Sequence, residues 1–106
     1  HMDNPKILCG ERSYEQKFYL NEAHEKLHQA IKDELKIMCV RFEQEISGII
    51  MREFDDEGNL KIFVTHKDDD IYHDEISSGL KIREMRNKNR ELFEQLEEYY
   101  DAIYGE

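Results

Sequence analysis

Apolar and polar positions alternate with a helical period in the middle of the chain. Between residues 24 and 46 the apolar side chains follow one another at steps of three and four, which places them on one face of an α-helix. These residues are Leu27, Ile31, Leu35, Met38, Phe42 and Ile46. Asn21 suits the N-cap position, and Ser47 with Gly48 suits the end of the helix. We therefore predict an amphipathic helix over residues 24–46.

The apolar pattern then changes to the two-residue alternation that is typical of β-strands. The segments "GIIMREF" (48–54) and "LKIFVTHK" (60–67) are rich in β-branched and aromatic residues. Between them, Gly58 and Asn59 are residues that tolerate positive φ in a tight turn. We predict two antiparallel strands with one apolar face turned towards the helices. That face consists of Ile50, Phe54, Leu60, Ile62 and Val64.

A polar segment, "KDDDIYHDE", leads to a second helical pattern, which we place at residues 78–104. Steps of three and four define a heptad seam along this helix. The seam consists of Ile82, Met85, Asn89, Leu92, Leu96, Tyr99 and Ile103. Phe93 and Tyr100 widen it, so packing within the chain and packing against a partner helix are both open.

The first 20 residues show no clear period. We expect residues 3–20 to form an irregular arm, in which a short strand or turn is left open, and His1-Met2 to be the remnant of an expression tag. One domain over residues 3–106 follows from the length. Its predicted class is α+β, with two layers in the order helix, β-hairpin, helix, preceded by the N-terminal arm.

Charge narrows the range of partners. The chain has 25 acidic and 15 basic residues and a formal net charge of −10. Nucleic-acid affinity depends mainly on Lys and Arg, so we expect no nucleic-acid partner and consider a basic protein the natural charged partner. No apolar stretch approaches the ~20 residues of a membrane span, and no secretory signal is recognisable. We expect a cytoplasmic protein whose two cysteines, Cys9 and Cys39, remain thiols.

One short motif suggests chemistry. His24, Glu25 and His28 spell H-E-x-x-H, in which two histidines one helical turn apart bind zinc and the glutamate acts as the general base. However, polar neighbours mark this helical surface as solvated, and the possible third ligands, Glu43 and Glu45, lie several turns away. A chain rich in Glu and His also produces the motif by chance. We therefore expect no catalytic residue, metal or cofactor, and keep a zinc-dependent hydrolase as the alternative.

Charges are distributed unequally along the predicted last helix. Residues 81–90 contain five bases and one acid, whereas residues 91–106 contain six acids and no base. This order opposes the dipole of a single helix, and an antiparallel partner would compensate it by placing acid against base. We therefore predict an antiparallel homodimer through the heptad seam.

Several phrases resemble a known family: "PKILCG", "SYEQKFYLN", "ELKIMCV", "EFDDEGNL" and "DEISSGLKI". Together they resemble small uncharacterised bacterial proteins grouped as a domain of unknown function. The resemblance implies a compact bacterial cytoplasmic protein and assigns no activity, cofactor or catalytic residue. The function expected from the sequence is a non-enzymatic interaction or regulatory module that acts as a homodimer.

Overall fold

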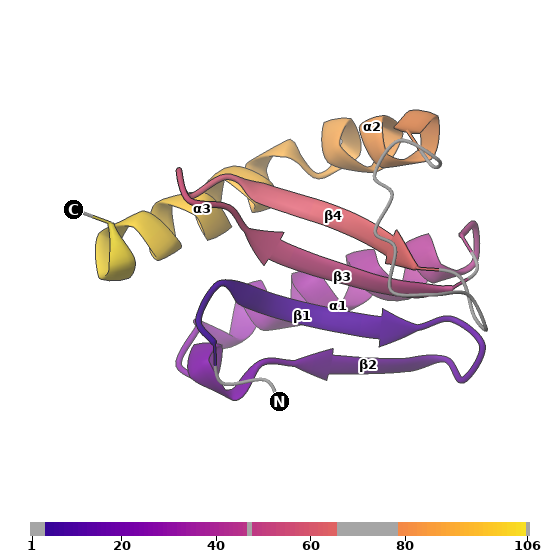
Figure 1. Ribbon diagram of the computed structural model, residues 1–106, viewed down its shortest axis with the longest axis horizontal. Helices are drawn as coiled ribbons and strands as arrows, with labels where there is room; N and C mark the ends of the chain where they lie inside the picture. The colour runs from indigo at the N-terminus through magenta and orange to yellow at the C-terminus, as the bar shows by residue number, and fades with distance from the viewer. Residues whose placement is uncertain (1–3, 47, 66–78, 106) are drawn as a thin grey trace.

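The protein forms two layers, a four-stranded antiparallel sheet with helices on one of its faces (Figure 1). The computed structural model describes residues 4–46, 48–65 and 79–105. Its strands are β1 (Ile7–Arg12), β2 (Lys17–Leu20), β3 (Ile49–Phe54) and β4 (Leu60–Thr65), in the spatial order β2-β1-β3-β4. Its helices are the short 3₁₀-helix η1 (Glu22–His24), α1 (Gln29–Glu43), α2 (Gly79–Lys88) and α3 (Arg90–Tyr104). The predicted α+β class is confirmed.

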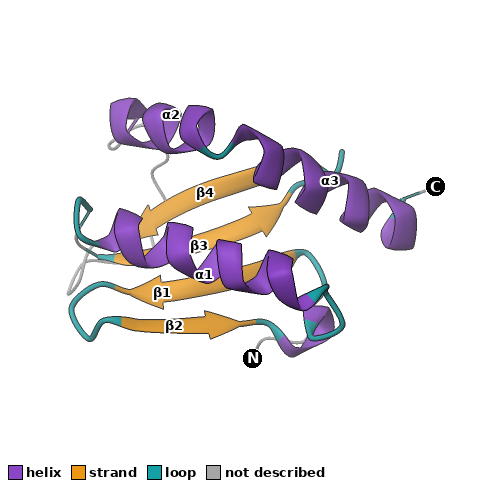
Figure 2. Ribbon diagram, turned by 180° about the vertical axis from the view of Figure 1, so that it is seen from behind, coloured by secondary structure: helices purple, strands orange, loops and turns teal. Residues whose placement is uncertain are grey.

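Figure 2 shows the helical layer from behind: α1 lies across the middle of the sheet, and α2 and α3 run along its β4 side. Apolar residues between the two layers form one continuous core, to which all four strands and the three α-helices contribute. No helix in residues 4–46, 48–65 and 79–105 is long and apolar enough to cross a membrane.

The predicted β-hairpin is confirmed as β3 and β4. Phe54 pairs with Leu60, and the five residues expected on the apolar face are all buried. Gly58 has a φ of +84°, as the turn requires. Asn59 does not share this conformation, because Gln16 is the one non-glycine residue with positive φ in the described part of the chain. Residues 66–67 of the expected second strand lie outside that part.

The N-terminal stretch differs from the expected irregular arm, because it contributes two strands to the sheet. β1 lies between β2 and β3, with Gly10 opposite Tyr19 on one side and Met51 on the other. A Cβ atom at Gly10 would lie 2.6 Å from the sulfur of Met51, so a larger residue there would require the end of the Met51 side chain to move. A register shift between Ile7 and Cys9 interrupts the alternation that would have indicated a strand.

The first helix begins at Gln29 and ends at Glu43, so the predicted range of 24–46 was too long at both ends. Asn21 caps η1 instead, and His28 caps α1 by accepting a hydrogen bond from the amide of Ala30 at 3.3 Å. The residues that α1 buries are Leu35, Met38, Cys39 and Phe42.

The predicted last helix is divided at Asn89 into α2 and α3. Asn89 leaves helical geometry (φ −120°, ψ 32°), and its side-chain amide donates to the carbonyl of Met85 at 2.8 Å. The division reverses part of the conflict between the charges and the helix dipole. Arg86 and Lys88 now stand in the last turn of α2, and Glu91 stands in the first turn of α3, where each sign is favourable.

Asn21 joins the end of β2 to the N-terminal residues. Its side chain is fully buried and donates to the carbonyls of Asn4 at 2.8 Å and Ile7 at 2.6 Å, while its oxygen accepts from the amide of Ala23 at 3.2 Å. One side chain therefore satisfies three backbone groups.

We expect Asn21→Ala to lower the free energy of unfolding by roughly 2 to 3 kcal/mol, because three partly buried hydrogen bonds to backbone groups are lost together. Urea denaturation followed by circular dichroism measures the change. Asn87→Ala, on the exposed surface of α2, is the matched control and should leave stability within about 0.5 kcal/mol. An equal loss in both variants would contradict a special role for Asn21.

Candidate functional site

His24, one of the two histidines considered as zinc ligands, does not lie on the surface of the protein. His24 is fully buried at the end of η1. Its Nε2 lies 2.6 Å from the carbonyl oxygen of Pro5, which only accepts, so Nε2 carries the proton. Its Nδ1 then accepts from the hydroxyl of Tyr99 at 2.7 Å. Both ring nitrogens are therefore engaged, and burial lowers the pKa of the imidazole below its ordinary value.

The two histidines of the H-E-x-x-H run lie in different environments. His28 and Glu25 are exposed, and the run spans η1, a turn and the cap of α1 rather than one helical face. Within the described ranges no group of three or more His, Cys, Asp or Glu side chains is placed to hold a metal ion. His24 instead packs among aromatic rings, with its centroid 5.5 Å from that of Tyr99 and 6.1 Å from that of Phe54.

Most of the seven residues expected at a dimer interface pack against other parts of the same chain. Ile82, Met85, Leu92 and Leu96 belong to the buried core. Asn89 and Tyr99 are partly buried, and Ile103 is 57% exposed. The heptad seam thus packs mainly within the chain. A dimer through it stays a prediction, and Ile103 is the seam residue most exposed for such a contact.

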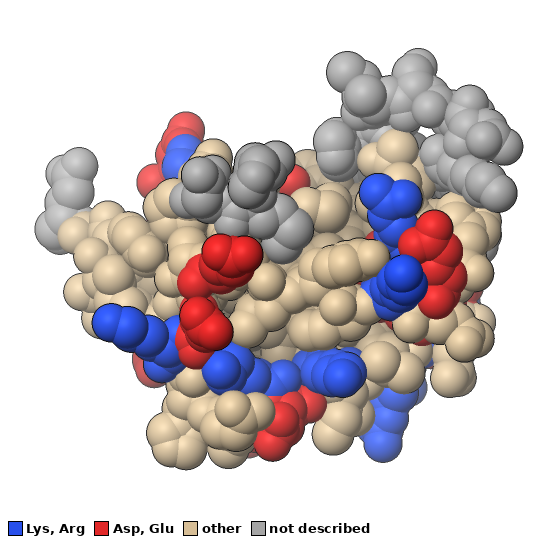
Figure 3. Space-filling view, turned by 90° about the horizontal axis from the view of Figure 1, so that it is seen from below, with Lys and Arg blue, Asp and Glu red and all other residues tan. Residues whose placement is uncertain are grey.

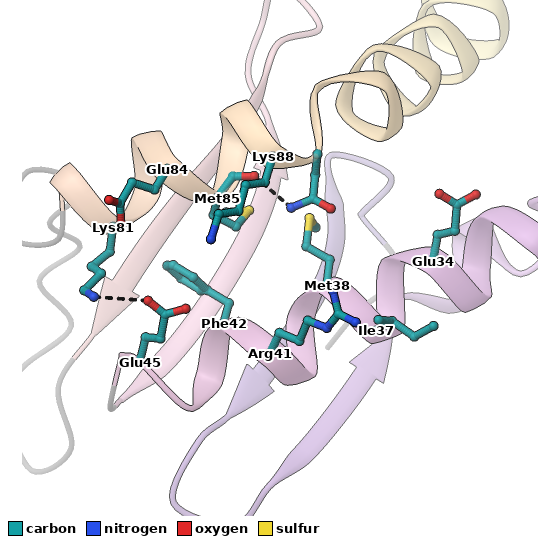
Figure 4. A pocket seen from close by; sticks show the side chains of 11 residues that line it. Glu34, Ile37, Met38, Arg41, Phe42, Glu45, Lys81, Glu84, Met85 and Lys88 are labelled. Atoms are coloured by element: carbon teal, nitrogen blue, oxygen red, sulfur yellow. Dashed lines mark hydrogen bonds and ion pairs between the residues drawn. The ribbon is translucent and has the colours of Figure 1, made fainter.

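The helical side contains a groove between α1 and α2, with a volume of about 330 Å³ (Figure 4). Met38 and Phe42 from α1 and Met85 from α2 form its apolar floor. Charged side chains surround the floor: Glu34, Arg41, Glu45, Lys81, Glu84 and Lys88. At one end, Lys81 donates to Glu45 at 3.1 Å and thereby joins the two walls.

Exposed apolar side chains stand beside this groove on α1. Ile37, which lines the groove, is 53% exposed, and Val40, three residues later, is 37% exposed. Residues three apart on a helix are neighbours on its surface. The outer face of α1 therefore presents a small apolar area next to a hollow with an apolar floor.

The acidic excess is distributed unevenly over the surface. In the view of Figure 3, basic and acidic groups are interspersed. By contrast, the turn between β3 and β4 and the neighbouring part of α3 bring many carboxylates together. They are Asp55, Asp56, Glu57, Glu94, Glu97, Glu98 and Asp101. Lys6 pairs with Asp56 at one edge of this area.

Sequence reasoning missed a buried polar cluster between β1, β3 and α1. Arg52 and Glu11 form an ion pair, and both side chains are completely buried. Arg52 also lies over the ring of Phe42, at 5.5 Å from its centroid. The alternation in "GIIMREF" could have indicated that Arg52 is buried, because it places Arg52 on the same face as Ile50 and Phe54.

Both cysteines border this cluster as buried, free thiols. Cys9 pairs with Arg52 across β1 and β3, and Cys39 lies on the inner face of α1. Burial raises the pKa of Cys39 well above its usual value. A protonated, inaccessible thiol is a poor nucleophile, so Cys39 serves packing.

A family model described as "Family of unknown function (DUF6145)" matches residues 5–106. No curated protein and no solved structure matches the chain.

We expect His24 to be neutral at pH 7, with its proton on Nε2, in long-range ¹H–¹⁵N spectra of the labelled protein. Because burial lowers its pKa in the folded state, its stabilising contribution is present above the ordinary value of 6.5 and is lost as the pH falls through the lowered pKa. Stoichiometric zinc in untagged protein, absent from a His28→Ala variant, would contradict this assignment and favour the hydrolase.

Proposed function

The chain belongs to the DUF6145 family of unknown function, and we propose that it is a non-enzymatic interaction module that acts as a homodimer. The observation that carries the proposal is the exposed apolar area of Ile37 and Val40 beside the α1–α2 groove. We propose a second copy of the chain as the occupant of this surface, in place of a contact through the heptad seam.

The charges on the outer face of α1 support a second copy in antiparallel orientation. Glu34 precedes Ile37 by three residues, and Arg41 follows it by four. Two copies of α1 that cross antiparallel near Ile37 would bring Glu34 of one copy against Arg41 of the partner subunit, and the converse pair would form by symmetry. An isologous interface of this kind satisfies both charges twice.

The size of the surface also bears on the proposal. α1 has 15 residues and is therefore about 22 Å long. A stable dimer commonly buries at least about 1,000 Å² in total, which is more than a single exposed helix stripe provides. The groove extends the surface from α1 to α2, so Ile37 of the partner subunit has an apolar floor of Met38 and Met85 to cover.

A basic protein as a further partner, the absence of nucleic-acid binding and a cytoplasmic location stay predictions from the sequence. The free cysteines are consistent with a reducing compartment. The carboxylates around the β3–β4 turn lie away from the outer face of α1, so a homodimer would leave them accessible to such a partner.

We expect wild-type protein to be a dimer in light scattering coupled to size exclusion. Ile37→Glu should raise the dissociation constant on the order of 100-fold, because it places a charge at the centre of the contact. Ile103→Glu is the matched control, since Ile103 is an isoleucine of similar exposure on α3.

The two variants also distinguish the two interfaces. Loss of the dimer in Ile103→Glu with retention in Ile37→Glu would favour the C-terminal helix and contradict the α1 contact. A wild-type monomer at high micromolar concentration would contradict the homodimer altogether. Circular dichroism checks that both variants keep the wild-type fold.

A charge reversal tests the antiparallel orientation. We expect Glu34→Arg alone or Arg41→Glu alone to weaken the dimer by roughly three- to tenfold, because each places like charges together. The double reversal should restore affinity, and the effect of either single variant should decrease at high salt. Additive weakening in the double variant, measured by sedimentation equilibrium, would exclude the predicted pairing.

A further inference from the structure

The polar cluster under α1 contains four buried side-chain atoms without a hydrogen-bond partner among the described residues: Nε and Nη2 of Arg52 and one carboxyl oxygen each of Glu11 and Glu43. Glu11 uses Oε1 to accept from Arg52, whereas its Oε2 is buried and has no hydrogen-bond partner among the described residues. Oε2 of Glu43, in the last position of α1, is also buried and has no such partner. Glu43 is nevertheless close enough to Glu11 for its carboxyl group to raise the pKa of Glu11.

Two ionised carboxylates cannot satisfy each other, because both only accept hydrogen bonds. One added proton changes this: a protonated carboxyl donates to its neighbour, and the two unpartnered oxygens become a donor and an acceptor. The alternative, two buried negative charges in contact, costs free energy that a single arginine compensates only in part.

We propose that Glu11 and Glu43 share one proton, which forms a buried carboxyl–carboxylate pair and holds the C-terminal end of α1 on β1. None of the atoms of this proton site belongs to the proposed dimer surface, because the site lies on the inner side of α1. The pair and Arg52 together carry no net charge when the proton is bound.

The surroundings of Glu11 favour retention of this proton near neutral pH. Burial raises the pKa of Glu11 to about 7, Arg52 opposes this increase, and the neighbouring carboxyl group of Glu43 adds to it. The charged and titratable groups that face Glu11 are Arg52 from β3, Glu43 and Cys39 from α1, and Cys9 from its own strand. From β2 its partner is Phe18, which is uncharged.

The sign of the pH dependence follows from the raised pKa. Between about 4.5, the ordinary value, and 7, the unfolded chain releases the proton while the folded chain keeps it. The contribution of this site to stability is therefore complete below about pH 4.5 and is lost as the pH rises to 7. The folding equilibrium constant should decrease on the order of 100-fold across this range through this site.

The direct test is a pH titration of the wild-type protein labelled with ¹³C at the glutamate carboxyl carbon. We expect one resonance, absent in Glu11→Gln, to titrate near pH 7. In Glu43→Gln the new amide donates to ionised Glu11 and one negative charge is gone, so its midpoint should decrease by about one pH unit or more. Glu15→Gln, at an exposed position, is the control and should leave the midpoint unchanged.

Unfolding free energies give a second readout. The difference between wild type and Glu11→Gln should depend on pH between 5 and 8, and contributions from other groups, including His24, cancel in this difference. A Glu11 carboxyl that titrates near 4.5 would overturn the proposal. A midpoint near 7 that is the same in wild type and Glu43→Gln would also overturn it, because burial alone would then account for the shift.

Discussion

The buried ion pair between Glu11 and Arg52 is the interaction on which the sheet depends. The two side chains come from neighbouring strands, and both are completely buried beneath α1. Removal of one partner from such a pair commonly costs about 3–5 kcal/mol, because the other charge stays buried without compensation. A slip of one residue between β1 and β3 would turn one of the charges to the opposite face. The pair therefore specifies the register that places the N-terminal hairpin in the sheet.

A second contact fixes the opposite end of the helical layer. His24 joins the carbonyl of Pro5 to the hydroxyl of Tyr99, so one imidazole connects the N-terminal residues to α3. Next to this contact, the ring of Phe54 from β3 stacks on that of Tyr100 from α3, with centroids 4.0 Å apart, so α3 is also joined to β3. At the edge of the sheet, Leu60 donates its amide proton to Glu97 at 2.8 Å, and its carbonyl accepts from Arg86. Charged side chains thus cover the start of the exposed edge of β4 and disfavour pairing with another strand there.

Periodicity predicted the elements that bury one regular face. The β3–β4 hairpin and the apolar residues of α1 were recognisable because their spacing follows the element that contains them. β1 was missed for the opposite reason: its register shift, Gly10 and inward-facing Glu11 interrupt any apolar alternation. The extent of α1 was also wrong, because Leu27 continues the helical spacing although it is buried from a turn.

The side-chain contacts of the candidate sites were harder to predict from the sequence than the fold. Glu11 and Arg52 lie 41 positions apart, so their pairing follows from strand order, which one sequence does not reveal. The motif at His24 indicated neither the backbone conformation of this run nor the burial of the imidazole, and burial determines whether an imidazole is a ligand or a core residue. Asn89 is a similar case: a polar residue in a heptad seam suggests a dimer register, whereas here it ends one helix and begins another.

The faces of α1 have different roles that meet at its C-terminal end. On the inner side Glu43, the last residue of the helix, approaches Glu11, and on the groove side Arg41, two residues earlier, belongs to the surface proposed for the second copy. Helix ends fray unless side-chain or tertiary contacts hold them. A proton shared by Glu11 and Glu43 would therefore order the same turn that presents Arg41. The position of the proton site thus links the two proposals physically, although each rests on different atoms.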